Sequence, residues 1–181
     1  MKEERLYIVG YMASGKTTFG RALAHEIGWN FIDLDEEIEK REGLSVSEIM
    51  ARYGEAYFRK AEAAALKATA VLSQTVIACG GGTPCQRDNM EFMTLHGMTL
   101  WLVASPKRIA ERISQAGNTR PLVAGRTGDE LVDFVKTHLL SRQPYYCRAL
   151  WRFSGEHLEN ENEISSSVRK FRTEFLPFAK K

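Results

Sequence analysis

Short apolar runs alternate with longer amphipathic stretches along the 181 residues. The apolar runs predict buried strands at 6–9, 31–35, 75–79, 98–103 and 150–153. The amphipathic stretches predict helices at 17–27, 55–72, 87–95, 106–115, 129–141 and 163–175, with one more short helix opening at the capping box of residues 45–48. This alternation predicts an α/β fold in which helices cover a parallel sheet.

The segment 116–128 follows neither period. It carries three glycines, one proline and two arginines, a composition that favours turns over helix or strand. We therefore expect a mobile lid at about 112–128. No repeat, low-complexity stretch or linker interrupts the chain, so a single domain spanning 1–181 is expected.

The composition narrows the class of protein. Hydrophobic residues make up 44% and charged residues 27% of the chain, with a net charge of +2. These values are those of a globular protein and give no reason to expect nucleic acid or a membrane as partner. No apolar run reaches the roughly 20 residues of a membrane span, and the first residues lack the pattern of a signal peptide. The three cysteines show no metal-ligand spacing, so reduced thiols and a cytoplasmic location are expected.

Residues 10–17, GYMASGKT, match the phosphate-loop pattern G-x-x-x-x-G-K-[ST] at every fixed position. A strand precedes the loop and a helix follows it, so backbone N–H groups and the positive end of the helix dipole can surround an anion. The pattern predicts that Lys16 reaches the β- and γ-phosphates and that the Thr17 hydroxyl binds Mg²⁺. The predicted nucleotide-binding residues here are Met12, Ala13, Ser14, Gly15, Lys16, Thr17 and Thr18.

Asp33 and Asp35 stand two residues apart at the end of the second predicted strand. On a strand both side chains would project from one face, at the carboxyl edge where ligands of open α/β sheets bind. They could bind the magnesium shell, accept a proton from a hydroxyl or hydrogen-bond a polyol. The alternative is a solvated turn that begins an acidic helix. Because no acidic residue ends the third strand, Asp33 is the natural carboxylate partner of the metal.

Two further features suggest an acceptor site. Arg59 and Glu62 are three residues apart on a predicted helix, where they form either an ordinary surface pair or a guanidinium facing the crevice. Gly80, Gly81 and Gly82 directly follow the third strand, which indicates either close backbone approach to a ligand or a wide turn.

Four arginines flank or occupy the predicted lid or lie on the helix after it. Lid closure typically brings cations over a transferring phosphoryl group, although each of them could also be an ordinary surface residue. They are Arg112, Arg120, Arg126 and Arg142. The four histidines show no ligand or triad spacing, and surface or packing roles are expected for them.

In combination, these motifs resemble the shikimate kinase family. The phosphate loop, FIDLD at 31–35, FRxxE at 58–62, the glycine triplet, RPL at 120–122 and RxPxY at 142–146 occur in order, and the resemblance covers 6–146. It implies a nucleoside-monophosphate-kinase-like fold, with a five-stranded parallel sheet and a lid. It also implies transfer of the γ-phosphoryl of ATP to the 3-hydroxyl of shikimate, in aromatic amino-acid biosynthesis, by a monomer that uses Mg²⁺.

The resemblance also implies roles for individual residues. Lys16, Asp33, Asp35 and Arg120 would be catalytic, with Thr17 and Asp33 near the metal and Arg112 and Arg120 near ATP. The substrate-binding region would span about 33–62. The acceptor would contact Asp35, Arg59, Gly80, Gly81, Gly82 and Arg142, with the two arginines of this set on its carboxylate.

Two positions depart from the family pattern. Ala13 stands where glycine is common, which should matter little if its φ is negative. Ala78 replaces a serine that could hold a magnesium-bound water.

Two rival functions remain possible on the sequence. One is another small-metabolite kinase, such as a gluconate kinase, which the arginine pair disfavours. The other is a nucleotide-binding protein without turnover; a GTPase switch would require an N-K-x-D segment, which the sequence lacks.

Overall fold

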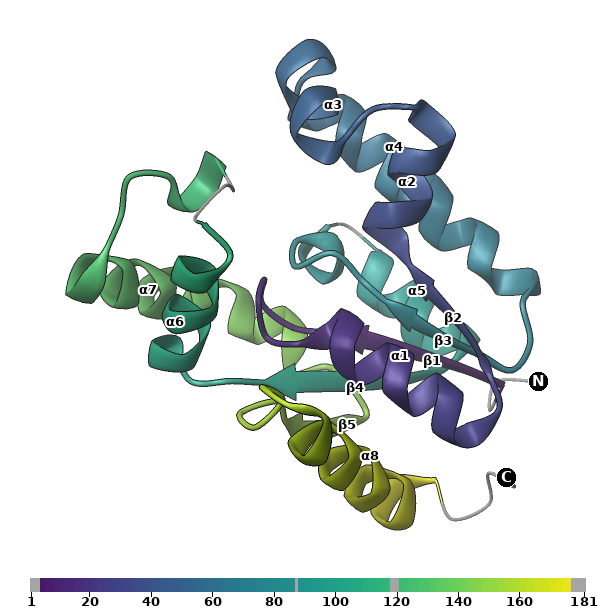
Figure 1. Ribbon diagram of the computed structural model, residues 1–181. Coiled ribbons are helices and arrows are strands. Elements are labelled where there is room, and N and C mark those ends of the chain that lie inside the picture. Colours follow the sequence, from purple (N-terminus) through teal and green to yellow (C-terminus); the bar gives the residue numbers. More distant parts are fainter. Residues whose placement is uncertain (1–3, 87, 118–120, 177–181) are drawn as a thin grey trace.

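The structure is a computed structural model that describes residues 4–86, 88–117 and 121–176. Five parallel strands form one sheet in the order β2-β3-β1-β4-β5. The strands are β1 (Arg5–Val9), β2 (Asn30–Asp33), β3 (Thr75–Ala78), β4 (Met98–Val103) and β5 (Trp151–Ser154). The parallel sheet and all five strands predicted from the sequence are confirmed, with ends shifted by one or two residues (Figure 1).

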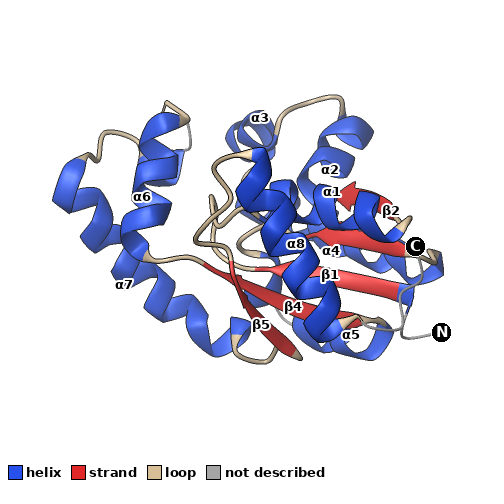
Figure 2. Ribbon diagram, turned by 60° about the horizontal axis from the view of Figure 1, so that its bottom comes forward, coloured by secondary structure: helices blue, strands red, loops and turns tan. Residues whose placement is uncertain are grey.

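Helices cover both faces of this sheet, which makes a three-layer fold (Figures 1 and 2). Along β1, Leu6 and Ile8 belong to one buried cluster while Tyr7 and Val9 belong to another, because alternate side chains of a strand point to opposite faces. The first cluster packs against α1 (Lys16–Ile27) and α8 (Glu161–Phe175), which lie side by side in both views. A core on each face of the sheet thus fixes the strand ends on which the site is built.

The second cluster contains side chains from the remaining helices. These are α2 (Leu34–Glu42), α3 (Val46–Tyr53), α4 (Glu55–Ala68), α5 (Asn89–His96), α6 (Pro106–Gln115) and α7 (Gly128–Tyr146). In Figure 1, α2, α3 and α4 form one group and α6 and α7 another. Short 3-10 helices at Thr69–Val71, Thr83–Cys85 and Pro121–Val123 complete the described elements.

The strand order places the phosphate loop at the switch point of the sheet. β2 and β3 lie on one side of β1, and β4 and β5 lie on the other. In open parallel sheets the ligand crevice forms where the strand order reverses, outside the carboxyl ends of the strands. The loop that follows β1 therefore opens into that crevice.

The prediction that the second strand runs to residue 35 is wrong. β2 ends at Asp33, and α2 begins at Leu34 with Asp33 as its N-cap. The Asp33 carboxylate accepts a hydrogen bond from the Asp35 backbone N–H, and the first turn of α2 also holds Glu36 and Glu37. A capping aspartate followed by acidic residues stabilises a helix N-terminus, and this local preference overrides the apolar strand pattern.

The helix predicted at 129–141 is longer than expected. It was predicted to end at residue 141, but α7 continues to Tyr146 with Pro144 inside it. Proline cannot donate the hydrogen bond to the carbonyl four residues earlier, which is that of Leu140. Because Leu140 is exposed, water can donate a hydrogen bond to that carbonyl instead. The extension places Arg142 and Tyr146 on one helix face, one turn apart.

Only part of the expected lid lies in the described residues. Its predicted start at residue 112 falls within α6, and residues 118–120 lie outside the described ranges. The described remainder includes Val123, which is fully buried against the core shared with α6 and α7. The mobility of this segment stays a prediction, as does its role as a lid.

Candidate active site

The phosphate loop has the local geometry that anion binding requires. Gly10 and Gly15 have φ values of +147° and +96°, which the sequence pattern anticipated. Gly15 is also the N-cap of α1, and it provides no side-chain cap; the first turn of that helix contains no acidic residue. No side chain of the helix start competes with an anion there, and the helix dipole favours a negative charge at this end.

Ala13 adopts a φ of +57°, so the condition under which this departure should matter little, a negative φ, is not met. The left-handed region disfavours a residue with a Cβ, by about 1 kcal/mol. A glycine at this position would occupy the same conformation without that penalty. The loop keeps its shape with alanine because the surrounding structure holds it.

Lys16 and Thr17 occupy the positions that the motif predicts. The Lys16 Nζ donates a 2.8 Å hydrogen bond to the Tyr11 carbonyl, so the ammonium group crosses the loop. The Thr17 hydroxyl donates a 2.6 Å hydrogen bond to the Asp33 carboxylate. Thr17 and Asp33 thus present two hard oxygen atoms side by side, the ligand type that Mg²⁺ prefers.

A cavity of about 1080 Å³ opens beside the loop and contains most of the predicted site. It is lined by the loop, by the ends of β2 and β3, and by parts of α3, α4, α6 and α7. Nearly all predicted site residues of the described chain lie on its wall: Met12, Ala13, Gly15, Lys16, Thr17, Thr18, Asp33, Asp35, Arg59, Gly80, Gly81, Gly82, Arg112 and Arg142.

One predicted residue of the described chain is not on that wall. Ser14 is fully buried below the loop, and its backbone N–H donates to the Tyr11 carbonyl at 3.2 Å. Arg120 lies outside the described residues.

Each glycine of the triplet lies against a different charged side chain. A Cβ on Gly80 would lie 2.8 Å from Asp35 Oδ1, and a Cβ on Gly82 would lie 2.8 Å from Arg59 Nη1. A Cβ on Gly81 would lie 3.4 Å from Arg142 Nη1 and 3.1 Å from the backbone N of Met12. None of the three has a positive φ. The triplet is therefore required for space, because any larger residue would push into the groups that line the cavity.

The Arg59–Glu62 pair is not an ordinary surface pair. The side chain of Arg59 is 19% exposed and that of Glu62 only 1%, with 2.9 Å between Nη1 and Oε2. The Thr83 hydroxyl donates to the other oxygen of Glu62 at 2.6 Å, and Glu55 binds Arg59 at 3.0 Å. Burial alone would lower the pKa of Arg59, but the two glutamates outweigh it and raise the pKa. The guanidinium therefore stays charged and fixed at the cavity wall.

Arg112 joins the phosphate loop to the segment after β5. Its guanidinium donates to the Ala13 carbonyl at 3.2 Å and to the Gly155 carbonyl at 2.9 Å, and it pairs with Glu159 at 2.6 Å. This anchoring places Arg112 beside the phosphate loop on the cavity wall. Its contact with the nucleotide stays a prediction.

Several residues with buried hydrogen bonds at the site were not predicted. Glu62 was considered only as a pairing partner, while the Tyr146 hydroxyl, which donates to the Gly81 carbonyl at 2.6 Å, was given no role. His138, expected to have only a surface or packing role, shares a 2.8 Å hydrogen bond with the Tyr11 hydroxyl. The RxPxY spacing was the available signal for Tyr146, because positions 142 and 146 share a face only if the helix continues through Pro144.

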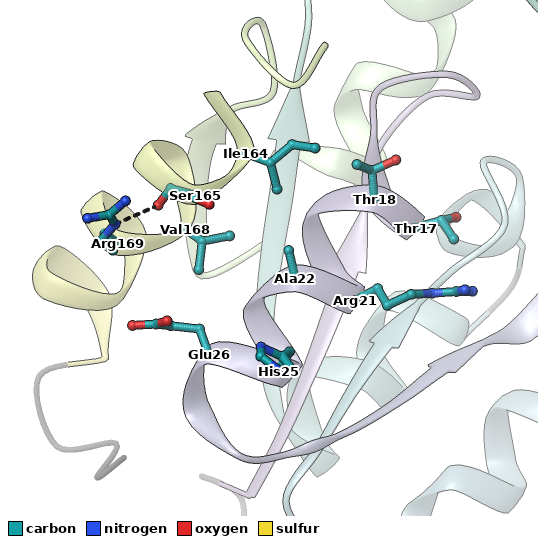
Figure 3. Close-up of a pocket in the computed structure, with 10 residues that line it drawn as sticks. All are labelled: Thr17, Thr18, Arg21, Ala22, His25, Glu26, Ile164, Ser165, Val168 and Arg169. Carbon is teal, nitrogen blue, oxygen red and sulfur yellow. Dashed lines mark hydrogen bonds between the residues drawn. The ribbon is translucent and has the colours of Figure 1, made fainter. Parts of the chain in front are cut away.

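A second hollow of about 900 Å³ lies between α1 and α8 (Figure 3). It shares Thr17 and Thr18 with the first cavity and is bordered by the exposed Arg21 and Arg169 and the half-buried Glu26. Glu26 at its edge pairs with Arg172 at 3.0 Å, and Arg21 pairs with Glu36 at 3.1 Å. The glycine triplet and the acceptor arginines are all in the first cavity, which is therefore the candidate active site.

The protein combines a parallel sheet, a phosphate loop at the end of β1 and an adjoining cavity with carboxylate and guanidinium groups. This combination defines the class of P-loop kinases that act on small molecules. Comparison with known proteins gives the family. The model of the shikimate kinase family matches residues 12–172. A curated shikimate kinase from Bacteroides fragilis is 40% identical over 168 residues, which is 93% of this chain and 94% of that protein. The chain belongs to the shikimate kinase family.

Solved structures agree with this assignment. A crystal structure of shikimate kinase from Bacteroides thetaiotaomicron is 40% identical, with 94% of this chain and 97% of that chain covered and a TM-score of 0.89. A structure of shikimate kinase from Acinetobacter baumannii in complex with shikimate is 29% identical, with 99% and 96% covered and a TM-score of 0.84. The predicted fold and family are confirmed, and the chain is an ATP-dependent kinase.

Among the described residues, no helix combines the length and the apolar character that crossing a bilayer requires. Within the same ranges, no cluster of three or more histidine, cysteine, aspartate or glutamate side chains could hold a metal ion. A magnesium site in a kinase needs no such cluster, because Mg²⁺ keeps several waters and binds one or two protein groups together with substrate phosphates.

Proposed function

We propose that this enzyme transfers the γ-phosphoryl group of ATP to the 3-hydroxyl of shikimate, giving shikimate 3-phosphate and ADP on the route to aromatic amino acids. The bond between the γ-phosphorus and the oxygen of ADP breaks, a bond to the 3-oxygen forms, and the hydroxyl proton is released. The observation that carries this proposal is the placement of Arg59, Arg142 and Asp35 around the glycine triplet in one cavity.

This placement supports an acceptor with one carboxylate and several hydroxyls. A guanidinium group binds a carboxylate through paired hydrogen bonds, and we assign Arg59 and Arg142 to that task. A carboxylate accepts hydrogen bonds from hydroxyls, and we assign Asp35 to the hydroxyl that attacks. The glycine backbone between them allows the acceptor ring to approach closely.

The donor side needs positioning and charge neutralisation, because phosphoryl transfer requires little covalent help from the protein. Lys16 and the N-terminus of α1, which no side chain caps, support binding of the β- and γ-phosphates. We assign Mg²⁺ to Thr17 and Asp33, whose oxygens are already 2.6 Å apart. When bound, the ion neutralises charge on the phosphate oxygens. Arg112 and Arg120 remain assigned to ATP from the sequence motifs.

The proposal extends to a monomer that acts in the cytoplasm. All groups assigned to donor and acceptor come from one chain, so the reaction needs no second subunit. The three cysteines Cys79, Cys85 and Cys147 are free, which fits a reducing compartment. Light scattering of the purified protein tests the first point, and a mass of twice 20.5 kDa would contradict it.

A coupled ADP-release assay tests the function directly. The purified protein is incubated with ATP, Mg²⁺ and either shikimate or gluconate, and the Lys16→Met variant, purified identically, measures contaminating activity. ADP release that depends on shikimate and disappears in the variant is expected. Gluconate-dependent release, or none with shikimate, would overturn the assignment of the acceptor.

A further inference from the structure

Arg142 lies against an aromatic ring that does not line the cavity. Its Cζ is 5.7 Å from the centroid of the Tyr11 ring, within the range of a cation–π interaction. Tyr11 belongs to the phosphate loop, is only 1% exposed and is not part of the cavity wall. The ring therefore contacts Arg142 from within the core and not from the cavity.

Tyr11 also binds the helix that carries Arg142. Its hydroxyl shares a 2.8 Å hydrogen bond with His138 Nδ1, and the two rings meet edge to face at 5.5 Å between centroids. His138 precedes Arg142 by four residues, so both side chains project from the same face of α7. A single tyrosine thus contacts α7 at two points one turn apart.

The protonation states favour one direction for this hydrogen bond. Burial raises the pKa of Tyr11 to about 12, so the phenol keeps its proton. Burial, together with the positive charge of Arg142, lowers the pKa of His138, so the imidazole is neutral near pH 7. A neutral imidazole offers one nitrogen as an acceptor, and the phenol donates to it.

The backbone of the same residue faces the donor side. The Tyr11 carbonyl accepts the hydrogen bond from Lys16 Nζ and a second one from the Ser14 N–H. Tyr11 is held by the loop on one side and touches α7 on the other. A change in its side chain therefore alters the position of Arg142 relative to the loop without removing any group that contacts phosphate.

We propose that Tyr11 is a positioning residue for acceptor recognition, which fixes the Arg142 guanidinium through its ring and through the hydrogen bond to His138. The inference rests on the proposed function, because it assumes that Arg142 binds the carboxylate of the acceptor. It predicts that the tyrosine, although part of the nucleotide loop, determines affinity for the acceptor rather than for ATP.

Steady-state kinetics of Tyr11→Phe tests this role. The variant keeps the ring and loses only the hydroxyl, so KM for shikimate should rise about 3- to 10-fold, the range that loss of one partly buried hydrogen bond gives. Turnover and KM for ATP should stay within about 2-fold, because the groups that bind phosphate are unchanged. His138→Leu removes the acceptor of the same bond and should reproduce the effect.

Tyr145→Phe is the matched control. Tyr145 lies on the same helix as Arg142 and is exposed, so loss of its hydroxyl should leave both KM values unchanged. Tyr11→Leu, which also removes the ring, should raise KM for shikimate further than Tyr11→Phe does. If the leucine variant does not fold, the phenylalanine and histidine variants still decide the question.

A double-mutant cycle separates positioning from general stability. In an Arg142→Gln background, Tyr11→Phe should have no further effect on kcat/KM for shikimate, because the group it positions is gone. Equal losses for ATP and shikimate, fully additive effects with Arg142→Gln, or no change in Tyr11→Phe would each overturn the proposal. If the unmodified chain does not use shikimate, the proposed function fails; if it does and these variants behave as the controls, only the inference fails.

Discussion

The two halves of the cavity that we assign to the donor and to the acceptor are built in opposite ways. The donor half comes mainly from one continuous segment, residues 10–18, whose backbone forms the binding surface. The acceptor half is collected from α2, α4, the glycine triplet and α7, and side chains form its surface. Arg59 and Arg142 are far apart in sequence, and they meet at the triplet only because α4 and α7 pack against the same face of the sheet.

This difference determines how each half responds to mutation. A backbone site depends on glycines and on a helix start, so side-chain changes outside its few fixed positions alter it little. A side-chain site depends on buried partners such as Glu62, which hold the charged groups in place. The acceptor half should therefore be the more sensitive of the two to conservative substitutions.

The largest expected effect is that of Asp35→Asn, which breaks the acceptor half alone. The amide cannot accept the proton of the attacking hydroxyl, so kcat should fall by about 10²- to 10⁴-fold. ATP affinity should stay nearly the same, because Asp35 is outside the phosphate loop. Single-turnover rates and a nucleotide titration measure the two quantities separately, and near-normal turnover would remove Asp35 from the mechanism.

Glu62→Gln should have the next largest effect. It replaces a charge that is 1% exposed and leaves Arg59 with only the exposed Glu55 as carboxylate partner, so the free energy of unfolding should fall by about 2 kcal/mol. KM for shikimate should rise as well, while KM for ATP should not. Urea unfolding and steady-state kinetics provide these values.

Thr83→Val is the control for Glu62→Gln, because it removes a hydrogen bond to Glu62 but keeps the carboxylate beside Arg59. Its effect on KM should be the smaller of the two. An unfolding free energy of Glu62→Gln equal to that of the unmodified protein would show that the pair does not hold the acceptor half together.

Ala13→Gly tests the donor half, where the backbone conformation is the feature that matters. Glycine relieves the cost of a φ of +57°, so the free energy of unfolding should rise by about 1 kcal/mol. Kinetic constants for both substrates should change little. Chemical denaturation measures the gain, and a loss of stability would show that the alanine methyl group contributes packing that outweighs the strain.

The smallest expected effect is a pH dependence centred on His138. Its pKa in the folded protein is below its ordinary value of 6.5, so the native state binds fewer protons than the unfolded state in that range. Stability should therefore be fully present above that value and decline as the pH falls below it. Ring resonances followed by NMR give the pKa, which should rise in Arg142→Gln; an unchanged pKa would contradict the charge contribution.

The same difference explains what could be predicted from the sequence. The phosphate loop is a local pattern, so its position between a strand and a helix could be predicted. The hydrogen bond between Thr17 and Asp33 was not predicted, although both residues were assigned to the metal. Asp33 and Asp35 were identified as site residues but for the wrong structural reason, since capping by Asp33 starts a helix where a strand was expected. At these residues the apolar pattern favours a strand and the capping preference of Asp33 favours a helix, and the helix forms.

Other features could not be found in a single sequence. The hydrogen bond between Tyr11 and His138 joins residues 127 apart, and neither residue belongs to a fixed position of the phosphate-loop motif. The positive φ of Ala13 is likewise hidden, because alanine gives no sign of a left-handed conformation. Tertiary packing determines both the Tyr11–His138 hydrogen bond and the φ of Ala13, and local sequence periodicity carries no information about such packing.

The glycine triplet sets a limit on redesign of this enzyme. Each of its three positions lies against a different functional group, and a methyl group on Gly80 or Gly82 would come within 3 Å of Asp35 or Arg59. A larger residue at these positions would therefore restrict the set of acceptors that can bind only by displacing the side chains of Asp35 or Arg59. A directed-evolution library that seeks a new acceptor should leave 80–82 constant and vary α3 instead, where the side chains of Val46, Ser47 and Met50 line the cavity. Val46 binds the Glu39 carboxylate only through its backbone N–H, at 2.8 Å, so a changed side chain keeps that contact.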